Sequence, residues 1–214
     1  MARRRFSIVP ILMLAIGIAA GWWLAKRVEW PQQWAARKPA QEQPTPTAPV
    51  TDIRKLDFRN FRYTPECLRN EDGTRGNLTT RGGSYERGEE FDRLSFTVGE
   101  VAYGNLSGDA REEAVVLTTC STGGSGSFTE GFVYGLVDGR PREIGRIESG
   151  SKAYGGILSM RVDQGLIIVE RYATDEDGPH CCPRYIDTTQ LRWDGGRFEQ
   201  VGVRTRRAVE AERD

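Results

Sequence analysis

The chain has 214 residues, and its 30 basic side chains equal its 30 acidic ones. Residues 1–27 carry five basic residues and no acid, which leaves 25 basic against 30 acidic residues, a net charge of −5, in the rest. A mildly acidic body argues against nucleic acid as a partner, since binding it requires a basic face. The 25 glycines, about 12% of the chain against an average of about 7%, favour turns and short strands over long helices.

The first segment is predicted to be a membrane anchor. Phe6 to Ala25 is a run of 20 residues without a charge, which is long enough to cross a bilayer as a helix. Three arginines precede the run, and Trp22 and Trp23 close it as an interfacial aromatic belt would. We predict a single transmembrane helix within residues 1–27, through which the protein contacts the membrane. The alternative is a cleaved signal peptide, for which the run is long.

Orientation and location follow from the flanking charges and the cysteines. Basic residues lie on both sides of the apolar run, so the positive-inside rule favours an inside N-terminus only narrowly. An even number of cysteines, four, suggests disulfides and therefore an oxidising compartment. We predict a single-pass protein of the inner (plasma) membrane whose C-terminal domain is extracytoplasmic, in the periplasm or cell envelope.

A linker is predicted over residues 28–50, followed by one globular domain at 51–214. Residues 39–50 contain four prolines in twelve positions without periodicity, which is typical of a semi-extended, solvated spacer. The remaining length is normal for a single domain.

The domain is predicted to be mainly β, with antiparallel strands joined by short Gly-rich turns. Asp194-Gly195-Gly196 predicts a hairpin between the last two strands, because glycine readily adopts the positive φ of such turns. The short connections indicate antiparallel pairing, since parallel strands need long crossovers. Only 206–213 is expected to be helical. The expected strands are 94–101, 113–119, 131–137, 142–147, 166–172, 185–193 and 197–203.

Cys67, Cys120, Cys181 and Cys182 are predicted to form two disulfides. Neighbouring cysteines rarely bond to each other because the geometry is strained. Cys67 and Cys120 are therefore each expected to bond to one member of the 181–182 pair, and both of these pairings stay open. Either bridge would close a long loop and stabilise the domain by roughly 4 kcal/mol.

Two segments are candidate metal sites. Asn105, Ser107, Asp109 and Glu113 stand at positions 1, 3, 5 and 9 of an oxygen-rich loop that resembles short calcium loops. Ala110 takes the place where such loops have glycine, so the prediction is a weak Ca²⁺ site, with a polar turn as the alternative. The segment 178–183, GPHCCP, is a second candidate, although adjacent cysteines fit zinc-ligand spacing poorly. No other cofactor is expected.

No catalytic set emerges from the residues. The single histidine, His180, argues against a Ser-His-Asp triad. A pair of carboxylates for hydrolysis stays open, with Asp175, Glu176 and Asp187 as candidates, because sequence does not show how far apart they lie. Several aromatic residues are candidates either for the core or for a binding surface: Phe128, Phe132, Tyr134, Tyr154 and Tyr172.

Five stretches and Cys120 carry a resemblance when they are taken together. The stretches are 101–117, 153–157, 166–172, 180–183 and 192–198. Together they resemble uncharacterised bacterial envelope proteins of the LppP/LprE lipoprotein type. The resemblance covers roughly residues 95–200, and its most specific element is Cys-Cys-Pro followed by Arg-Trp-Asp-Gly-Gly. It implies an exported, membrane-tethered domain and supplies no catalytic residues. The lipidated cysteine of those lipoproteins is absent, since no cysteine precedes Cys67. We therefore expect a binding or structural module, with an envelope hydrolase or a metal-handling protein as alternatives.

Overall fold

The fold is built from antiparallel strands that follow one another in the chain. The computed structural model describes residues 49–89, 92–123, 126–148, 150–175 and 182–209. Three short 3-10 helices lie in these ranges, η1 (Ile53–Lys55), η2 (Glu66–Leu68) and η4 (Lys152–Tyr154). The strands are β1 (Arg62–Tyr63), β2 (Leu78–Thr79), β3 (Ser84–Arg87), β4 (Leu94–Gly104), β5 (Glu113–Ser121), β6 (Ser127–Val137), β7 (Arg140–Ile147), β8 (Ile157–Asp163), β9 (Leu166–Ala173), β10 (Tyr185–Trp193) and β11 (Phe198–Ala208).

The strands form three sheets, and sequence neighbours are sheet neighbours in the two larger ones. One sheet has five strands in the order β3-β4-β5-β6-β7, one has four in the order β11-β10-β9-β8, and β1 pairs with β2. Every paired set of named strands is antiparallel. The predicted fold class of antiparallel β structure is confirmed, and the turn at Asp138-Gly139, where both residues have positive φ, joins β6 to β7.

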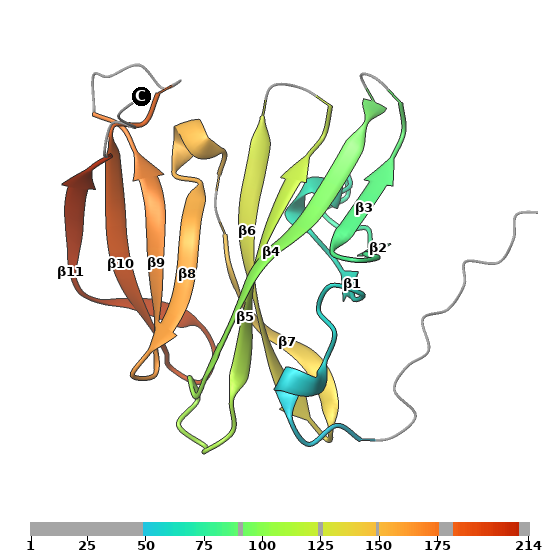
Figure 1. Cartoon of the computed structure of the whole chain (residues 1–214), viewed down its shortest axis with the longest axis vertical. Helices are drawn as coiled ribbons and strands as arrows, with labels where there is room; N and C mark the ends of the chain where they lie inside the picture. Colours follow the sequence, from blue (N-terminus) through green and yellow to red (C-terminus); the bar gives the residue numbers. More distant parts are fainter. Residues whose placement is uncertain (1–48, 90–91, 124–125, 149, 176–181, 210–214) are drawn as a thin grey trace, which may run out of the picture. The chain divides into compact units, whose positions relative to one another are not determined.

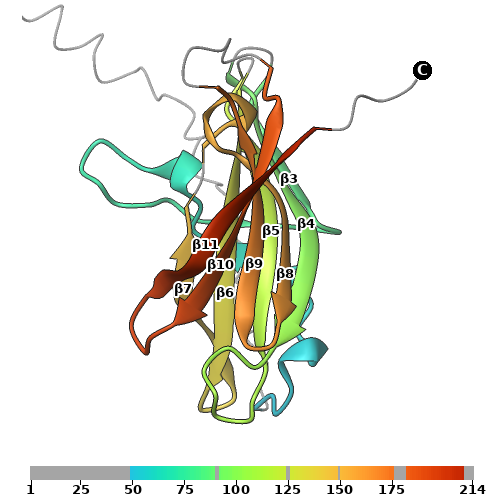
Figure 2. The same ribbon diagram turned by 90° about the vertical axis from the view of Figure 1, so that its left-hand side faces the viewer.

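The five-stranded sheet is the middle of three layers (Figure 1). The four-stranded sheet lies on one side of it, and the segment that carries η1, β1, η2 and β2 lies on the other. Ala114 and Val116 of β5 belong to the core on the side of this segment, whereas Val115 and Leu117 belong to the core beneath the four-stranded sheet. Burial on both faces explains why β5 reads as a continuous apolar run. Figure 2 looks onto the four-stranded sheet.

The core on the side of the N-terminal segment is aromatic. Phe58, Phe61 and Tyr63 pack against Phe132 and Tyr134 of β6, with ring centroids 5.1 to 6.3 Å apart in the contacting pairs. The Tyr63 hydroxyl donates a hydrogen bond to the Phe58 carbonyl at 2.6 Å. Phe132 and Tyr134 are thus core residues, while Phe128 and Tyr154 are 45% and 69% exposed. The core alternative therefore holds for Phe132 and Tyr134, while a binding surface stays a prediction for Phe128 and Tyr154.

The end of the described chain is a strand. The predicted hairpin at Asp194-Gly195-Gly196 is confirmed as β10 and β11, but the helix predicted at 206–213 is wrong for its first residues. Arg206 to Ala208 continue β11, because Arg206 and Arg207 pair with Asp187 and Ile186 of β10. The Arg206 guanidinium also forms an ion pair with Asp187 across the two strands.

Several predicted features lie on residues that the structure does not describe. The anchor within Phe6 to Ala25 and most of the linker at 28–50 lie outside the described residues, as do Glu176, His180 and Cys181. In the part of the chain that the structure describes, no helix is long and apolar enough to cross a membrane.

Candidate functional site

A disulfide joins η2 to β5. The Cys67 and Cys120 sulfurs are 2.02 Å apart and their Cα atoms 6.4 Å apart. The prediction that these two residues are disulfide-bonded is confirmed, but their predicted bonding to the 181–182 pair is wrong. Cys120 faces the N-terminal segment. Cys182 is exposed and precedes β10 of the sheet on the opposite face. Cys120 and the strand that follows its predicted partner Cys182 therefore lie on opposite faces of the five-stranded sheet.

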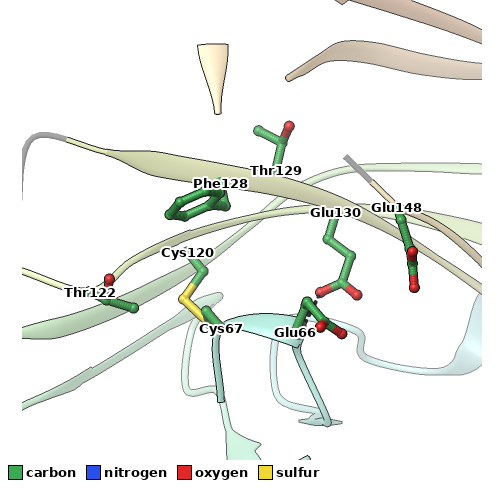
Figure 3. A pocket seen from close by; sticks show the side chains of 8 residues that line it. All are labelled: Glu66, Cys67, Cys120, Thr122, Phe128, Thr129, Glu130 and Glu148. Carbon is green, nitrogen blue, oxygen red and sulfur yellow. Dashed lines mark hydrogen bonds between the residues drawn. A yellow bond between two sulfur atoms is a disulfide. The ribbon is translucent and has the colours of Figure 1, made fainter. Parts of the chain in front are cut away.

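A cleft of about 390 Å³ opens beside this disulfide, between η2 and the strands β5 and β6 (Figure 3). Residues from four stretches of the chain meet there, within 66–67, 120–122 and 128–130 and at position 148. A second hollow in the described surface is lined only by residues of the single hairpin β6–β7. The lining of the cleft combines a disulfide, an aromatic ring and three carboxylates: Glu66, Cys67, Cys120, Thr122, Phe128, Thr129, Glu130 and Glu148.

Strand geometry places the side chains of the cleft. Phe128 and Glu130 are two residues apart on β6, so they project from the same face. Cys120 pairs with Phe128 in the register of β5 and β6, which brings the disulfide next to the ring. Glu66 opens η2, and its backbone N–H donates to the Glu130 carboxylate at 3.0 Å. The disulfide and this hydrogen bond together hold η2 over the sheet.

Glu130 is a buried carboxylate with an arginine partner. Its side chain and that of Arg146 are each 10% exposed, and Arg146 Nη1 lies 2.5 Å from Glu130 Oε1. Arg146 also donates to the Thr64 carbonyl at 3.0 Å and covers the Phe132 ring at 4.5 Å. Burial raises the pKa of Glu130, while the hydrogen bond from Glu66 and the charge of Arg146 act in the opposite direction.

The other two carboxylates lie nearer to solvent. Arg69 and Arg75 both bind the Glu66 carboxylate, the second at 2.7 Å. Chiefly through the hydrogen bond from Arg69, the pKa of Glu66 is lowered to about 2. Glu148 has a side chain that is 69% exposed, and its ion pair with Arg75 is long, at 3.6 Å.

We expect Arg69→Gln to raise the pKa of Glu66 from about 2 toward 4.5. The pKa of Glu66 is lower in the folded state than in the unfolded chain. The Glu66–Arg69 pair therefore stabilises the protein fully above about pH 4.5 and loses its effect as the pH falls toward 2. A carboxyl-detected NMR titration checks the shift. Arg161→Gln, which removes an exposed arginine paired with Asp163 on another sheet, is the control and leaves the Glu66 titration in place. An unchanged Glu66 titration in Arg69→Gln would contradict the assignment.

The four residues of the predicted calcium loop do lie together. The Glu113 carboxylate accepts from the backbone N–H of Leu106 at 2.7 Å, and Ser107 Oγ lies 2.9 Å from Glu113 Oε1 and 3.0 Å from Asp109 Oδ1. Asn105 Oδ1 accepts from the backbone N–H of Gly108 at 2.6 Å. Arg111 binds the Asp109 carboxylate, whose pKa is lowered to about 2 chiefly by that hydrogen bond. These oxygens therefore have protein partners, and Ca²⁺ binding stays a prediction.

Ala110 in this loop has φ of +68°, in the left-handed region where glycine is favoured. It is exposed, so Ala110→Gly removes this strain without opening a cavity. We expect the variant to raise the free energy of unfolding by about 1 kcal/mol, measured by urea denaturation. Gly108→Ala, at φ of +79° in the same loop, is expected to lower it by a similar amount. A loss of stability in Ala110→Gly would contradict this reading.

The acids predicted for hydrolysis are not brought into the cleft. Asp187 is buried, and Arg206 holds its carboxylate with hydrogen bonds of 2.6 and 2.9 Å that lower its pKa. Asp175 lies 3.7 Å from Arg184, and neither acid lines the cleft. Among the described residues, no group of three or more His, Cys, Asp and Glu side chains has a metal-binding arrangement.

The comparisons with known proteins assign no family. No family model matches the chain, and neither a curated protein nor a solved structure matches it. The resemblance to LppP/LprE-type lipoproteins therefore stays a prediction. Of the cleft residues, only the two cysteines and Phe128 were singled out from the sequence. Glu66, Glu130 and Glu148 carry no motif: Glu66 opens a 3-10 helix, Glu130 stands within a strand, and Glu148 directly follows one.

Proposed function

We propose that this protein is a membrane-tethered, extracytoplasmic binding module whose ligand site is the cleft beside the Cys67–Cys120 disulfide. The observation that carries the proposal is this cleft, which joins the exposed Phe128 ring to a buried, hydrogen-bonded carboxylate, Glu130, and to two more exposed carboxylates. A concave site with an apolar wall and a few placed polar groups is the usual form of a small-ligand pocket.

The state of the carboxylates favours binding over proton transfer. The Glu130 carboxylate receives hydrogen bonds from Arg146 and from the Glu66 backbone, and two arginines bind the Glu66 carboxylate. Among the described residues, no buried side-chain nitrogen or oxygen lacks a hydrogen-bond partner. Groups held in this way give a site with a fixed shape and charge, which lowers the ordering cost of binding.

The location rests on the disulfide and the N-terminal sequence. Disulfides persist in oxidising compartments and are rare in the cytosol. The apolar run from Phe6 to Ala25 supplies the tether. The resemblance to LppP/LprE-type envelope proteins is consistent with the same location and adds no ligand.

A second candidate function is hydrolysis by two carboxylates, for which the cleft offers a pair other than the predicted acids. Burial raises the pKa of Glu130, whereas arginines lower that of Glu66. Environments that push two pKa values apart are typical of acid and base pairs. Turnover of chromogenic glycosides or esters that is lost in Glu130→Gln would favour this candidate over the binding module.

Two measurements test the proposal on the full chain. A reporter enzyme that works only outside the cytosol, fused to the C-terminus, is expected to be active. A fragment library is then screened against the detergent-solubilised protein by ligand-observed NMR. We expect hits whose signal disappears in Phe128→Ala and persists in Val203→Ala, a control that truncates a side chain 87% exposed on β11. An inactive reporter would overturn the location, and the lack of any Phe128-dependent hit would overturn the binding site.

A further inference from the structure

The cleft has two chemically different halves. Figure 3 shows Phe128 and the Cys67–Cys120 disulfide at one side, and Glu130 and Glu148 at the other, with Glu66 facing Glu130 from below. The apolar half offers a ring that is 45% exposed and a disulfide, neither of which carries charge. The charged groups of the other half are carboxylates, which accept hydrogen bonds when ionised. A complementary ligand therefore has an apolar body and a hydrogen-bond donor at one end.

The charges around the acidic half do not cancel. The network contains four glutamates, at positions 66, 130, 143 and 148, and three arginines, at positions 69, 75 and 146. It consists of two ion-paired groups, which are joined by the hydrogen bond from the Glu66 backbone N–H to Glu130. Its formal charge is thus −1. No lysine or arginine lines the cleft itself, so the side that meets a ligand is acidic while the balancing guanidiniums lie around it.

Glu148 is the carboxylate with the weakest internal partner. The other carboxylates of the network have arginine contacts of 2.9 Å or less, whereas Glu148 is 3.6 Å from Arg75 and 69% exposed. One acceptor group that is open to solvent suits a single ammonium, a compact charge with three donors. A guanidinium binds a carboxylate best through two parallel hydrogen bonds. The carboxylates of Glu66 and Glu130 are already bound by arginines of the protein.

We propose that the cleft binds a small organic ammonium, with its charge at Glu148 and its apolar body against Phe128 and the disulfide. This inference rests on the proposed function and names its ligand class. A volume of about 390 Å³ is in the range of small-molecule pockets. The Phe128 ring adds a favourable interaction with the cation wherever the ammonium approaches its face.

The test compares three probes of similar size and different charge on the full, unreduced chain. The probes are 2-phenylethylammonium, 2-phenylethanol and phenylacetate, titrated by ligand-observed NMR. We expect the ammonium to bind at least about fivefold more tightly than the alcohol, and the carboxylate to bind most weakly. Raising the salt concentration is expected to weaken ammonium binding and to leave alcohol binding nearly unchanged.

Three variants locate the charge and the apolar contact. Glu148→Gln is expected to lower ammonium affinity about fivefold without changing alcohol affinity, and Phe128→Ala to lower both. Glu86→Gln is a matched control, because Glu86 lies on β3 of the five-stranded sheet, has a side chain that is 60% exposed and pairs with Arg93. This variant is expected to change neither affinity. Thermal unfolding measurements check that each variant is folded, as expected for substitutions at exposed positions.

The outcomes separate this inference from the proposed function. Equal affinity for all three probes, lost in Phe128→Ala, would overturn the ammonium assignment and keep the binding cleft. Ammonium binding that survives both Glu148→Gln and Phe128→Ala would place the site elsewhere and overturn the inference. Absence of binding by every probe would also overturn it, and the fragment screen then decides independently whether the cleft binds any ligand.

Discussion

Replacing Cys67 and Cys120 with alanine is expected to lower the free energy of unfolding by about 4 kcal/mol. The bridge spans a sequence separation of 53 residues, and opening a loop of this length returns conformational entropy to the unfolded chain. It also ties η2 to β5, so its loss frees the segment that covers the aromatic core. Urea denaturation of the unreduced protein and of the double variant measures the difference.

A second double variant supplies the control. Ser95 and Ser121 form a cross-strand pair on β4 and β5 beside Cys120, and replacing both with alanine is expected to cost less than about 1 kcal/mol. Non-reducing peptide mapping should recover a peptide pair that joins Cys67 to Cys120. A cost near 1 kcal/mol for the cysteine variant, or a map that joins Cys120 to 181 or 182, would contradict the observed pairing.

Arg146→Met is expected to destabilise the protein by about 3–5 kcal/mol at neutral pH. The substitution keeps an apolar side chain over the Phe132 ring but leaves Glu130 buried without its countercharge. The backbone carbonyl of Thr64 loses a donor as well. Equilibrium denaturation checks the magnitude, with unfolding in wild-type protein as the reference.

The pH dependence shows whether the cost comes from the charge of Glu130. Burial raises the pKa of this carboxyl, so the folded state binds its proton more readily than the unfolded chain does. The stability deficit of Arg146→Met is therefore expected to be small at low pH and to grow as the pH rises through the folded-state pKa. Adding Glu130→Gln should recover much of the loss. Arg161→Met, which breaks an exposed pair, should cost less than about 1 kcal/mol, and an equal cost would contradict the role of burial.

Strands with a strong local pattern were predicted from the sequence close to their observed positions. The expected strands at 113–119 and 166–172 became β5 and β9, Glu113–Ser121 and Leu166–Ala173. Both are rich in β-branched residues, which fit a pleated and buried surface. The strand β8, Ile157–Asp163, was not predicted. Its pattern mixes exposed and buried positions irregularly, since a bulge between Ile157 and Ser159 breaks the alternation.

The short elements of the N-terminal segment were also not predicted. β1 and β2 have two residues each, too few to give a periodic pattern. Their positions depend on Phe58 and Tyr63 packing against the five-stranded sheet, which is a contact between distant parts of the chain. The helix expected at 206–213 failed for a related reason. The charged residues of this segment suggest a solvent-exposed helix when the segment is considered alone. In the structure, Arg206 pairs with Asp187 across the hairpin.

The candidate site depends on such distant contacts throughout. Counting cysteines predicted that Cys67 and Cys120 are bonded, but choosing their partners required knowing on which side of the five-stranded sheet each cysteine lies. The glutamates of the cleft come from η2, β6 and the residue after β7, and no spacing in the chain relates them.

The composition and periodicity of this chain determined by themselves that the domain is antiparallel β structure with glycine turns and a disulfide, because these properties arise from interactions between near neighbours and from counts of residue types. Tertiary structure alone decided the Cys67–Cys120 pairing, the burial of Glu130 against Arg146 and the cleft between η2 and β6. Each of these features requires the 50–80 segment to pack against the five-stranded sheet, whose strands come after this segment in the sequence. The free energy of that docking comes from burying the aromatic core, which no local pattern reports.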